Sequence, residues 1–259
     1  MLKLSVVLAT FNEEENIGRC LESCRSLASE IVAVDGSSTD STREILKKYG
    51  AHVLVRENPT NFHINKQLAI GQAKAEWILQ LDADEVVSPE LKKEILNVIS
   101  LPAINGYWIP RKNYFLGRAL KKGGQYPDYT LRLYRRGKGI LPAKNVHEQA
   151  VVSGKTAYLK NDLLHFSCPN FGHYLEHFNR YTDIFASELN EQKTALDWLT
   201  AFDYLVIKPK IWFFKTYLRH KGFMDGLPGF AFSLFSALRY PVAYIKYWEK
   251  KNSFRYLQP

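Results

Sequence analysis

The sequence predicts an α/β protein with a mixed sheet, parallel in its N-terminal half, and an amphipathic helical C-terminal region. Three observations lead to this prediction. Short apolar runs alternate with amphipathic segments over residues 1–100, which is the pattern of a parallel sheet with helices. Strand-like runs then follow one another without intervening helices over residues 101–170, which indicates an antiparallel half. Residues 171–259 carry aromatic and apolar side chains at helical spacing.

The first strand is expected at residues 4–9, an apolar run that stops at the polar turn containing Thr10 and Asn12. A helix is expected over residues 13–27, because apolar side chains recur there at intervals of three and four residues.

A second strand at residues 30–35 ends in Asp35. Ser41 and Glu44 match a capping box, which predicts that a helix starts there. The remaining elements of this half are expected at residues 51–55, 64–75 and 77–81, followed by a helix that Ser88 caps and Pro89 begins.

The antiparallel half and the start of the helical region follow. Strands are expected at residues 107–110, 129–135, 146–152 and 158–166. A helix is expected over residues 173–189, where aromatic side chains form one stripe.

Charge and cysteine usage limit the compartment and the partners. The net charge is +9, and residues 208–259 hold ten Lys or Arg against two Asp or Glu, so the basic charge is concentrated in the tail. Three cysteines without CxxC spacing indicate a reducing compartment. The N-terminus leads into a strand without a signal-peptide pattern, so a cytoplasmic location is expected.

The apolar run Trp77–Leu81 is followed at once by Asp82, Asp84 and Glu85. In open α/β sheets, ligands bind just beyond the carboxyl ends of the strands, which is where these carboxylates are expected. A carboxylate at a buried sheet edge carries a desolvation cost unless it is paired or metal-bound. A divalent cation, Mg²⁺ or Mn²⁺, held by one or two carboxylates and substrate phosphates removes that cost. Taken alone, Asp-x-Asp is more often a solvated loop.

Neither GxGxxG after the first strand nor GxxxxGK is present, which excludes the usual dinucleotide and P-loop sites. Three other motifs are present in order: Ser5–Glu14 (SVVLATFNEE), Val34–Thr42 (VDGSSTDST) and Leu81–Glu85 (LDADE). On these motifs the chain resembles the family 2 glycosyltransferases, which have the GT-A fold. The resemblance covers residues 1–100, which would be the nucleotide-sugar-binding half of a domain spanning residues 1–170.

The resemblance implies roles for particular residues. Thr10, Asn12 and Glu14 would line the nucleobase pocket, Asp35 would bind the base or ribose, Asp82 would contact the ribose or metal, and Asp84 would hold a divalent ion on the donor diphosphate. Such an ion neutralises charge on the departing nucleoside diphosphate.

The second half is similar to the bacterial enzymes of this family that add glucose to the lipopolysaccharide core. The similarity lies in Tyr126–Arg135 (YPDYTLRLYR), Val146–Glu148 (VHE) and Lys221–Gly226 (KGFMDG). It implies inverting transfer of a hexose, from UDP-glucose or a similar donor, to a saccharide or lipid-linked acceptor in cell-envelope synthesis. Residues 101–170 would form the acceptor half.

Inverting transfer needs a carboxylate to accept the proton of the attacking hydroxyl, and Asp128 matches the position of that base. The family usually has Glu-Asp where this chain has Pro-Asp. A late histidine usually completes the metal site of the family, and His165 fits that place, with His147 as the alternative.

Three further residues of this half have less defined roles. Arg132 and Arg135 are candidate phosphate or acceptor contacts, although alternating arginines on a strand more often form its solvated face, and Glu148 is a candidate acceptor contact.

Two rival functions belong to other classes. His173, Glu176 and His177 match the H-x-x-E-H zinc-peptidase signature, but that match leaves the N-terminal half unexplained. The other rival is a non-catalytic module at a membrane surface that keeps the nucleotide pocket without turnover.

The tail from Lys208 interleaves cations with Trp212, Phe213, Phe214, Phe230, Phe232 and Phe235. Such a composition suits a helix in the headgroup layer of an anionic membrane, which predicts a peripheral position at the inner face of the cytoplasmic membrane. The alternatives are a helix packed on the domain and, less favoured because no RNA-binding motif is present, RNA binding. No nucleic-acid partner is therefore expected.

Overall fold

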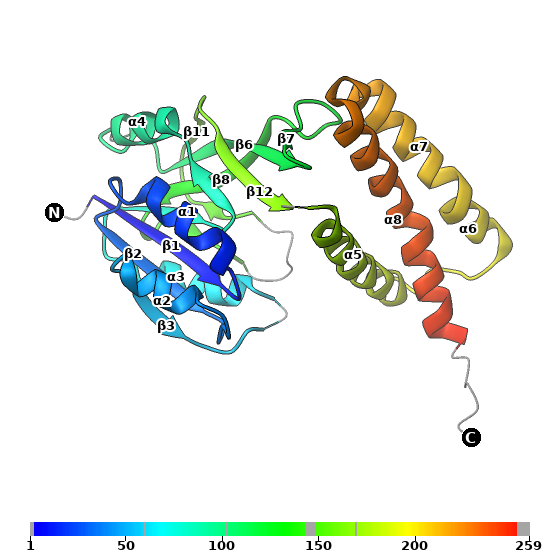
Figure 1. Cartoon of the computed structure of the whole chain (residues 1–259), viewed down its shortest axis with the longest axis horizontal. Coiled ribbons are helices and arrows are strands. Elements are labelled where there is room, and N and C mark those ends of the chain that lie inside the picture. Colours follow the sequence, from blue (N-terminus) through cyan, green and yellow to red (C-terminus); the bar gives the residue numbers. More distant parts are fainter. Residues whose placement is uncertain (1–2, 60, 102, 143–148, 169, 253–259) are drawn as a thin grey trace. The chain divides into compact units, whose positions relative to one another are not determined.

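A computed structural model describes residues 3–59, 61–101, 103–142, 149–168 and 170–252 (Figure 1). The chain divides into two compact units. Unit 1 contains Met1–Asn113 and Pro127–Ser167, and unit 2 contains Tyr114–Tyr126 and Cys168–Pro259. The segment Tyr114–Tyr126, which the sequence places in the first domain, therefore belongs to the second unit.

Parallel strands form the first half of the sheet in unit 1, in the order β3-β2-β1-β4. These strands are β1 (Leu4–Thr10), β2 (Glu30–Asp35), β3 (His52–Val55) and β4 (Trp77–Leu81). Thr10 is in register with Asp35, and Leu8 with Leu81. The carboxyl ends of β1, β2 and β4 therefore meet at one edge of the sheet, as the sequence predicts.

The second half of the sheet continues from β4 in the order β8-β6-β12-β5. The main strands are β8 (Asp128–Arg135), β6 (Gly106–Phe115), β12 (Leu163–Cys168) and β5 (Glu85–Val87). The pairs β4–β8, β8–β6 and β12–β5 are antiparallel. The mixed sheet expected from the sequence is thus confirmed.

Several strand boundaries differ from the sequence-based ones. The strand predicted at residues 158–166 is two strands, β11 (Thr156–Tyr158), which pairs in parallel with β6, and β12, which lies between β6 and β5. Part of the strand predicted at residues 146–152 lies outside the described residues, and β10 (Val151–Val152) pairs with β9 (Gly139–Ile140). The two-residue β7 (Arg118–Ala119) pairs with the end of β6.

Four helices flank the sheet of unit 1: α1 (Glu14–Cys24), α2 (Thr42–Lys48), α3 (His63–Gln72) and α4 (Pro89–Val98). Side chains of β1 alternate between its faces, so Leu4 and Leu8 pack with α1, α2 and α4, while Val7 packs with α3. The predicted cap of α4 forms, since Ser88 accepts from Leu91 N at 3.2 Å.

The predicted capping box of α2 does not form. Ser41 makes no side-chain cap, and Asp40 instead accepts from Thr42 N at 3.0 Å.

Unit 2 contains a helical rod and two long helices. The rod runs without a break from Trp198 to Arg219 through α6 (Trp198–Phe202), the π-helix η1 (Asp203–Ile207), α7 (Lys208–Phe214) and the π-helix η2 (Lys215–Arg219). The long helices are α5 (Phe171–Glu191) and α8 (Gly226–Asn252). Helix α8 packs against both α5 and the rod (Figure 1). Among the described residues, no helix has the length and apolar character needed to cross a membrane.

The motif KGFMDG forms the turn between the rod and α8, through the 3-10 helix η3 (Gly222–Asp225). Gly226 has a φ of 65°, which favours glycine. Gly229 in the first turn of α8 lies against the carbonyl oxygen of Gly222, and a Cβ there would be 2.0 Å from that oxygen. The conformation and packing of the backbone within unit 2 therefore explain why glycine stands at Gly226 of the motif and at Gly229 just after it.

Gly229→Ala is expected to destabilise unit 2 by about 2 kcal/mol, because backbone must move to admit the methyl group. The matched control is Gly71→Ala in α3, where a Cβ meets no heavy atom within 4 Å. That change should be neutral or stabilise by up to ~1 kcal/mol. Denaturant unfolding of the two variants measures both effects, and equal stability would show that the close approach is absent.

Candidate active site

Thr10 and Asp35 are brought together at the carboxyl ends of β1 and β2. Thr10 Oγ1 donates to Asp35 Oδ2 at 3.1 Å, and Ser38 donates to the same carboxylate from its backbone N (2.9 Å) and its Oγ (2.6 Å). Asp35 is completely buried. Both of its oxygens are therefore satisfied within the protein, and the carboxylate fixes the loop that follows β2.

The predicted donor-pocket residues Asn12 and Glu14 join two loops to each other. Asn12 Oδ1 accepts from Thr39 N at 2.9 Å, and Glu14 Oε2 accepts from Ser41 N at 3.0 Å. Asn12 adopts a φ of 54°, a conformation that asparagine tolerates better than most residues. These contacts hold the loop after β1 against the loop after β2.

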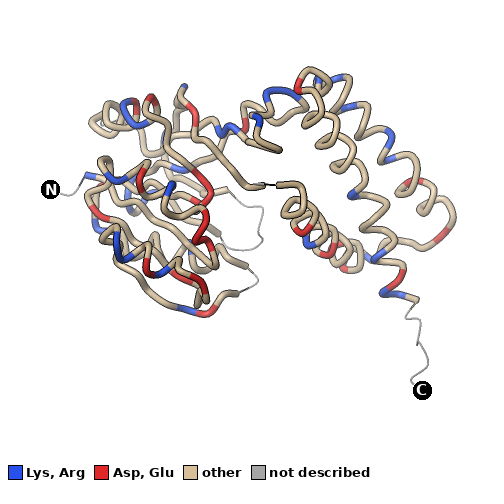
Figure 2. Tube along the Cα trace, in the orientation of Figure 1, with Lys and Arg blue, Asp and Glu red and all other residues tan. Residues whose placement is uncertain are grey.

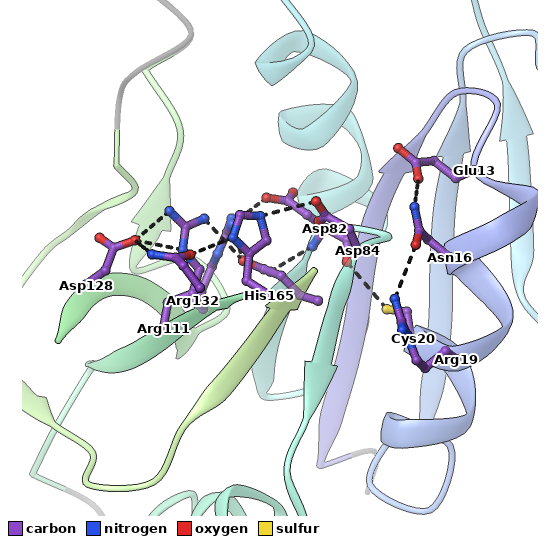
Figure 3. Close-up of polar contacts among 12 residues, drawn as sticks. Glu13, Asn16, Arg19, Cys20, Asp82, Asp84, Arg111, Asp128, Arg132 and His165 are labelled. Carbon is purple, nitrogen blue, oxygen red and sulfur yellow. Dashed lines mark hydrogen bonds and ion pairs between the residues drawn. The ribbon is translucent and has the colours of Figure 1, made fainter. Parts of the chain in front are cut away.

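Glu13, which the sequence does not single out, is the glutamate whose charge is coupled to the carboxylates after β4. Burial, together with the charges of Asp84 and Asp82, raises the pKa of its carboxyl to about 7, against the lowering effect of a hydrogen bond from Asn16. Figure 3 shows the hydrogen bond between Glu13 and Asn16. Nothing in the run Glu13–Glu15 distinguishes one glutamate from the next, so the sequence offers no signal for this residue.

Asp82 is held in a buried cluster of charges. It pairs with Lys66 and with Arg132, and Arg132 also donates to Glu85 at 2.8 Å (Figure 3). Burial opposes ionisation of Asp82, but Arg132 and Lys66 outweigh it and hold the pKa of the carboxyl well below its usual range. Arg132 is likewise buried, and Asp82 and Glu85 keep its pKa raised. Arg132 is thus a counter-ion inside the protein and does not present a free phosphate clamp.

Arg111 on β6 extends this cluster to Asp128, the predicted base. Its Nη1 lies 3.6 Å from Glu85, while its Nε and Nη2 donate to Asp128 Oδ2 at 2.9 and 2.7 Å. Asn113 Nδ2 donates to the same oxygen at 3.2 Å. Among the described residues, no contact reaches the other oxygen, Oδ1, and the Asp128 side chain is 34% exposed. One oxygen is anchored and the other is open to an acceptor.

His165 on β12 lies beside Asp84, as expected of the residue that completes the metal site. Its Nε2 is 3.2 Å from Asp84 Oδ2, and its Nδ1 is 2.6 Å from Asn113 Oδ1. Burial opposes ionisation of Asp84, but His165 in its charged form, donating from Nε2, lowers the pKa of this carboxyl overall. The alternative, His147, and the candidate Glu148 lie outside the described residues.

The donor set of Asp84 and His165 fits a divalent cation. Since Asn113 turns its amide N–H toward Asp128, its oxygen faces His165, whose Nδ1 must then carry the proton. A neutral ring consequently points the Nε2 lone pair at the Asp84 carboxylate, and two acceptors facing each other call for a cation or a proton. No group of three His, Cys, Asp or Glu in the described part of the chain is arranged to hold a metal, so water and phosphate would supply the other ligands.

Arg135 does not join the other candidates. It pairs with Trp77 at the opposite end of β4 from Asp82, seven residues along β8 from Asp128, or ~23 Å in a strand. There it contacts Glu76 and donates to Leu101 O at 3.0 Å. Its predicted role in binding phosphate or acceptor is therefore replaced by a structural one at the far end of the sheet.

The rival zinc-peptidase motif lies on α5 in unit 2. The rings of His173 and His177 are 4.3 Å apart between centroids, and Glu176 lies 3.8 Å from His173. Across the described residues, these side chains do not form part of a group of three that could hold a metal.

The family model "Glycosyl transferase family 2" matches residues 5–163. The chain belongs to this family. A relative from Rhizobium meliloti, named lipopolysaccharide core biosynthesis glycosyltransferase LpsC, is 30% identical over 236 residues, which cover 88% of this chain and 86% of the relative. An uncharacterized glycosyltransferase of Rickettsia typhi is 27% identical over 92% of this chain and 84% of its own.

Solved structures of similar fold agree with this membership. TarS of Staphylococcus aureus matches with a TM-score of 0.51 and 19% identity, over 87% of this chain and 46% of that chain, so this chain spans less than half of it. The curated name of TarS is poly(ribitol-phosphate) beta-N-acetylglucosaminyltransferase. The mannosyltransferase PcManGT of Pyrobaculum calidifontis, solved with GDP-Man and Mn²⁺, has a TM-score of 0.51 at 15% identity. The GT-A fold expected from the sequence is thereby confirmed.

Glu13→Gln is expected to make stability less sensitive to pH in metal-free buffer. In the native state the carboxyl keeps its proton up to about pH 7, whereas its ordinary pKa is 4.5. Because the native state then holds more protons than the unfolded state between these values, wild-type stability should fall as pH rises through this window. The variant lacks that fall, so its advantage should grow from pH 4.5 to 7. Exposed Glu15→Gln is the control, and parallel profiles for all three proteins would contradict the burial of Glu13.

Proposed function

We propose that the chain is a metal-dependent, inverting glycosyltransferase that moves a hexose from a nucleoside diphosphate donor to an acceptor of cell-envelope synthesis. The observation that carries this proposal is the Asp128 carboxylate. Its Oδ2 is anchored by Arg111 and Asn113, and its Oδ1 is open. The same Asn113 connects it to His165, and through His165 to Asp84.

Asp84 and His165 would hold the divalent cation, Mg²⁺ or Mn²⁺, at the donor diphosphate. When bound, such a cation offsets the charge that develops on the departing diphosphate. Three cations, Lys66, Arg111 and Arg132, already balance Asp82, Glu85 and Asp128 within the cluster. The carboxylate of Asp84 is therefore not neutralised by these cations and is available to a divalent ion.

Asp128 would act as the general base of inverting transfer. Its Oδ1 accepts the proton of an acceptor hydroxyl as that oxygen attacks the anomeric carbon. The new carbon–oxygen bond forms on the face opposite the diphosphate, whose bond to the sugar breaks as the nucleoside diphosphate leaves. Arg111 and Asn113 hold Oδ2, so the carboxylate keeps one orientation during the reaction. Glu85 cannot replace Asp128, because it is completely buried.

The donor side is expected to accept UDP-glucose or a similar nucleotide sugar. Thr10 and Asp35 would support donor binding without touching the donor, because Asp35 has no exposed surface. Their role would be to fix the loop after β2.

Cell-envelope synthesis is supported by the names of two relatives. LpsC is named for the biosynthesis of the lipopolysaccharide core, and TarS for transfer to poly(ribitol-phosphate). Both names describe cell-envelope polymers, and they support a saccharide or lipid-linked acceptor for this chain. A non-catalytic nucleotide-sugar-binding module is the rival, and turnover of a donor with an acceptor distinguishes the two.

Asp128→Asn is expected to lower the transfer rate ~10²–10⁴-fold while UDP affinity is retained, because only the base is removed. The control is Asp162→Asn, which removes a carboxylate paired with Lys112 at 2.7 Å outside the charge cluster. Proton NMR of the product reports whether the anomeric configuration inverts. Normal turnover by the Asp128 variant, or retention of configuration, would rule out the proposed mechanism.

Asp84→Asn is expected to abolish the dependence of UDP binding on Mn²⁺, measured by calorimetry. The amide has no charge to share with a cation, so UDP should bind equally with and without the metal. Asp128→Asn serves as control and should keep the metal dependence. Unchanged metal-dependent affinity in the Asp84 variant would place the cation elsewhere.

A further inference from the structure

Unit 2 carries an unusual density of exposed apolar side chains. Thirteen of the 27 large hydrophobic side chains that are exposed on the described residues lie between Leu196 and Phe230. Trp198 is 74% exposed and Leu227 is 73% exposed. A stretch with so many exposed apolar groups is typical of an interaction surface.

Seven of these side chains form a stripe along the rod, in two runs of helical spacing. Ile207, Ile211, Phe214 and Leu218 recur at intervals of four, three and four residues, which places them on one side of a helix. Trp198, Phe202 and Leu205 form an earlier run with intervals of four and three residues, which ends two residues before Ile207. The rod packs against α8 through other side chains, Tyr204 on Tyr244 and Trp212 beside Tyr240. We call the stripe, together with the exposed residues of the adjoining turn, the apolar face: Trp198, Leu199, Phe202, Leu205, Ile207, Ile211, Phe214, Leu218, Phe223, Met224 and Leu227.

The apolar face differs from the aromatic set that the sequence suggests. Trp212 lies under Arg239 and beside Tyr240, and Phe213 stacks on Tyr217. Phe235 packs against aromatic side chains of α5. These aromatics pack within unit 2, whereas Phe214, Phe230 and residues before Lys208 are exposed.

Uncompensated positive charge accompanies the apolar face. Lys210, Lys215, Arg219 and Lys221 are exposed, and none forms an ion pair with another described residue. Figure 2 marks the Lys and Arg positions along the rod in blue. The acidic residues of the same stretch are engaged. Asp203 pairs with Lys208 at 2.7 Å, and Asp225 accepts from Lys122 N at 2.7 Å.

We propose that the apolar face docks onto the surface of an anionic lipid bilayer. Apolar side chains on one side of a helix, with Lys and Arg beside them, are what the headgroup layer of such a membrane accommodates. A second copy of this chain fits less well, because pairing two identical faces would bring the same four cations together without acidic partners. The proposal concerns unit 2 and does not depend on the chemistry assigned to unit 1.

Co-sedimentation of the full chain with vesicles tests the proposal. The protein should pellet with vesicles of phosphatidylglycerol and phosphatidylcholine, and much less with phosphatidylcholine alone. Each basic residue near an anionic surface contributes roughly fivefold to the partition coefficient, so binding should weaken as salt rises. Because burial of apolar side chains is not screened, part of the binding should persist at 0.5 M salt, ~3 times the physiological ionic strength.

Matched variants separate the apolar face from apolar exposure in general. The double variant Phe214→Ser with Leu218→Ser should lower the partition coefficient for anionic vesicles at least about tenfold. The reason is that two apolar side chains that would be buried in the bilayer are removed. Ile245→Ser removes an apolar side chain of α8 that is equally exposed, at 55%, and should leave partition unchanged. The contribution of charge is tested with two triple variants, whose partition coefficients are compared. One carries Lys215→Gln, Arg219→Gln and Lys221→Gln beside the apolar face, and its control carries Lys47→Gln, Lys48→Gln and Lys93→Gln in unit 1.

Each outcome decides for or against the proposal. Loss of vesicle binding in the Phe214 and Lys215 sets, with both control sets unaffected, supports it. Full-length protein that stays in the supernatant with anionic vesicles at low salt overturns it. A third outcome is that the protein does not bind vesicles but forms a dimer in sedimentation equilibrium, and that Phe214→Ser with Leu218→Ser dissociates this dimer. That result would assign the apolar face to contact with a second copy of the chain.

A separate observation in unit 1 concerns Asn113, to which the sequence assigns no role. Its amide N–H is bound to Asp128 and its oxygen to His165 Nδ1. The geometry points to Asn113 as a positioning residue that fixes the Nδ1–H tautomer of His165, so that Nε2 faces Asp84 with its lone pair. The tautomer follows from the two hydrogen bonds of Asn113 alone. Only the binding of a cation by the Nε2 lone pair rests on the proposed function.

Asn113→Asp and Asn113→Leu test this role. Aspartate still accepts from His165 Nδ1, so Asn113→Asp should keep the Nδ1–H tautomer, while Asn113→Leu should shift the neutral ring toward Nε2–H. Nitrogen-15 NMR of the metal-free protein, at a pH where the ring is neutral, identifies the tautomer. In Asn113→Leu, Mn²⁺ affinity should also fall ~10–100-fold.

An unchanged tautomer in Asn113→Leu overturns the assignment. A changed tautomer with unchanged Mn²⁺ affinity would instead reject the metal site, so the two failures are distinguishable.

Discussion

Arg132 lies buried between Asp82 and Glu85, and the arrangement of the candidate active site depends on this contact. It joins β8 to the segment where β4 ends and β5 begins. Arg132 and its two partners are separated in the sequence by about fifty residues. Removing one partner would leave an uncompensated buried charge, a change that typically costs ~3–5 kcal/mol. Glu85 also accepts from Asp82 N at 2.9 Å, so the same cluster fixes the backbone that carries Asp84. The charges of the cluster therefore set the geometry on which donor binding would depend.

Two polar side chains connect this cluster to the proposed chemistry. Arg111 carries the charge pairing from Glu85 to Asp128, and Asn113 carries hydrogen bonding from Asp128 to His165. Both lie on β6, on alternate positions of the strand, which puts them on the same face. The proposed base and the proposed metal ligand His165 are thus both held by side chains of β6. The described part of unit 2 is held together by packing between aromatic side chains and not by buried charges. The residues of the apolar face remain exposed.

The sequence located the strand ends correctly because a strand end depends on local pattern. The apolar runs of β1, β2 and β4 stop at Thr10, Asp35 and Asp82, and parallel pairing brings these ends to one edge. The partners of these residues could not be predicted in the same way. Lys66 reaches the cluster from α3 through the packing of that helix on the sheet, and Arg111 reaches it through strand order and register. Both depend on contacts between different segments of the chain. Arg132 and Arg135 look alike in the sequence, yet one is buried beside Asp82 and the other lies at the opposite end of β8.

The sequence by itself determined the family and the mixed sheet and singled out Asp82, Asp84, Asp128 and His165 as candidates, since motifs and periodicity are local properties of the chain. Tertiary structure decided which of these side chains are available. It satisfies Asp35 internally, leaves one oxygen of Asp128 open, and couples Glu13 rather than Glu14 to Asp84. It also decided which apolar residues of the tail are exposed. The reason is that burial and ion pairing are set by contacts between distant segments, and composition alone carries no information about which face of a helix is covered.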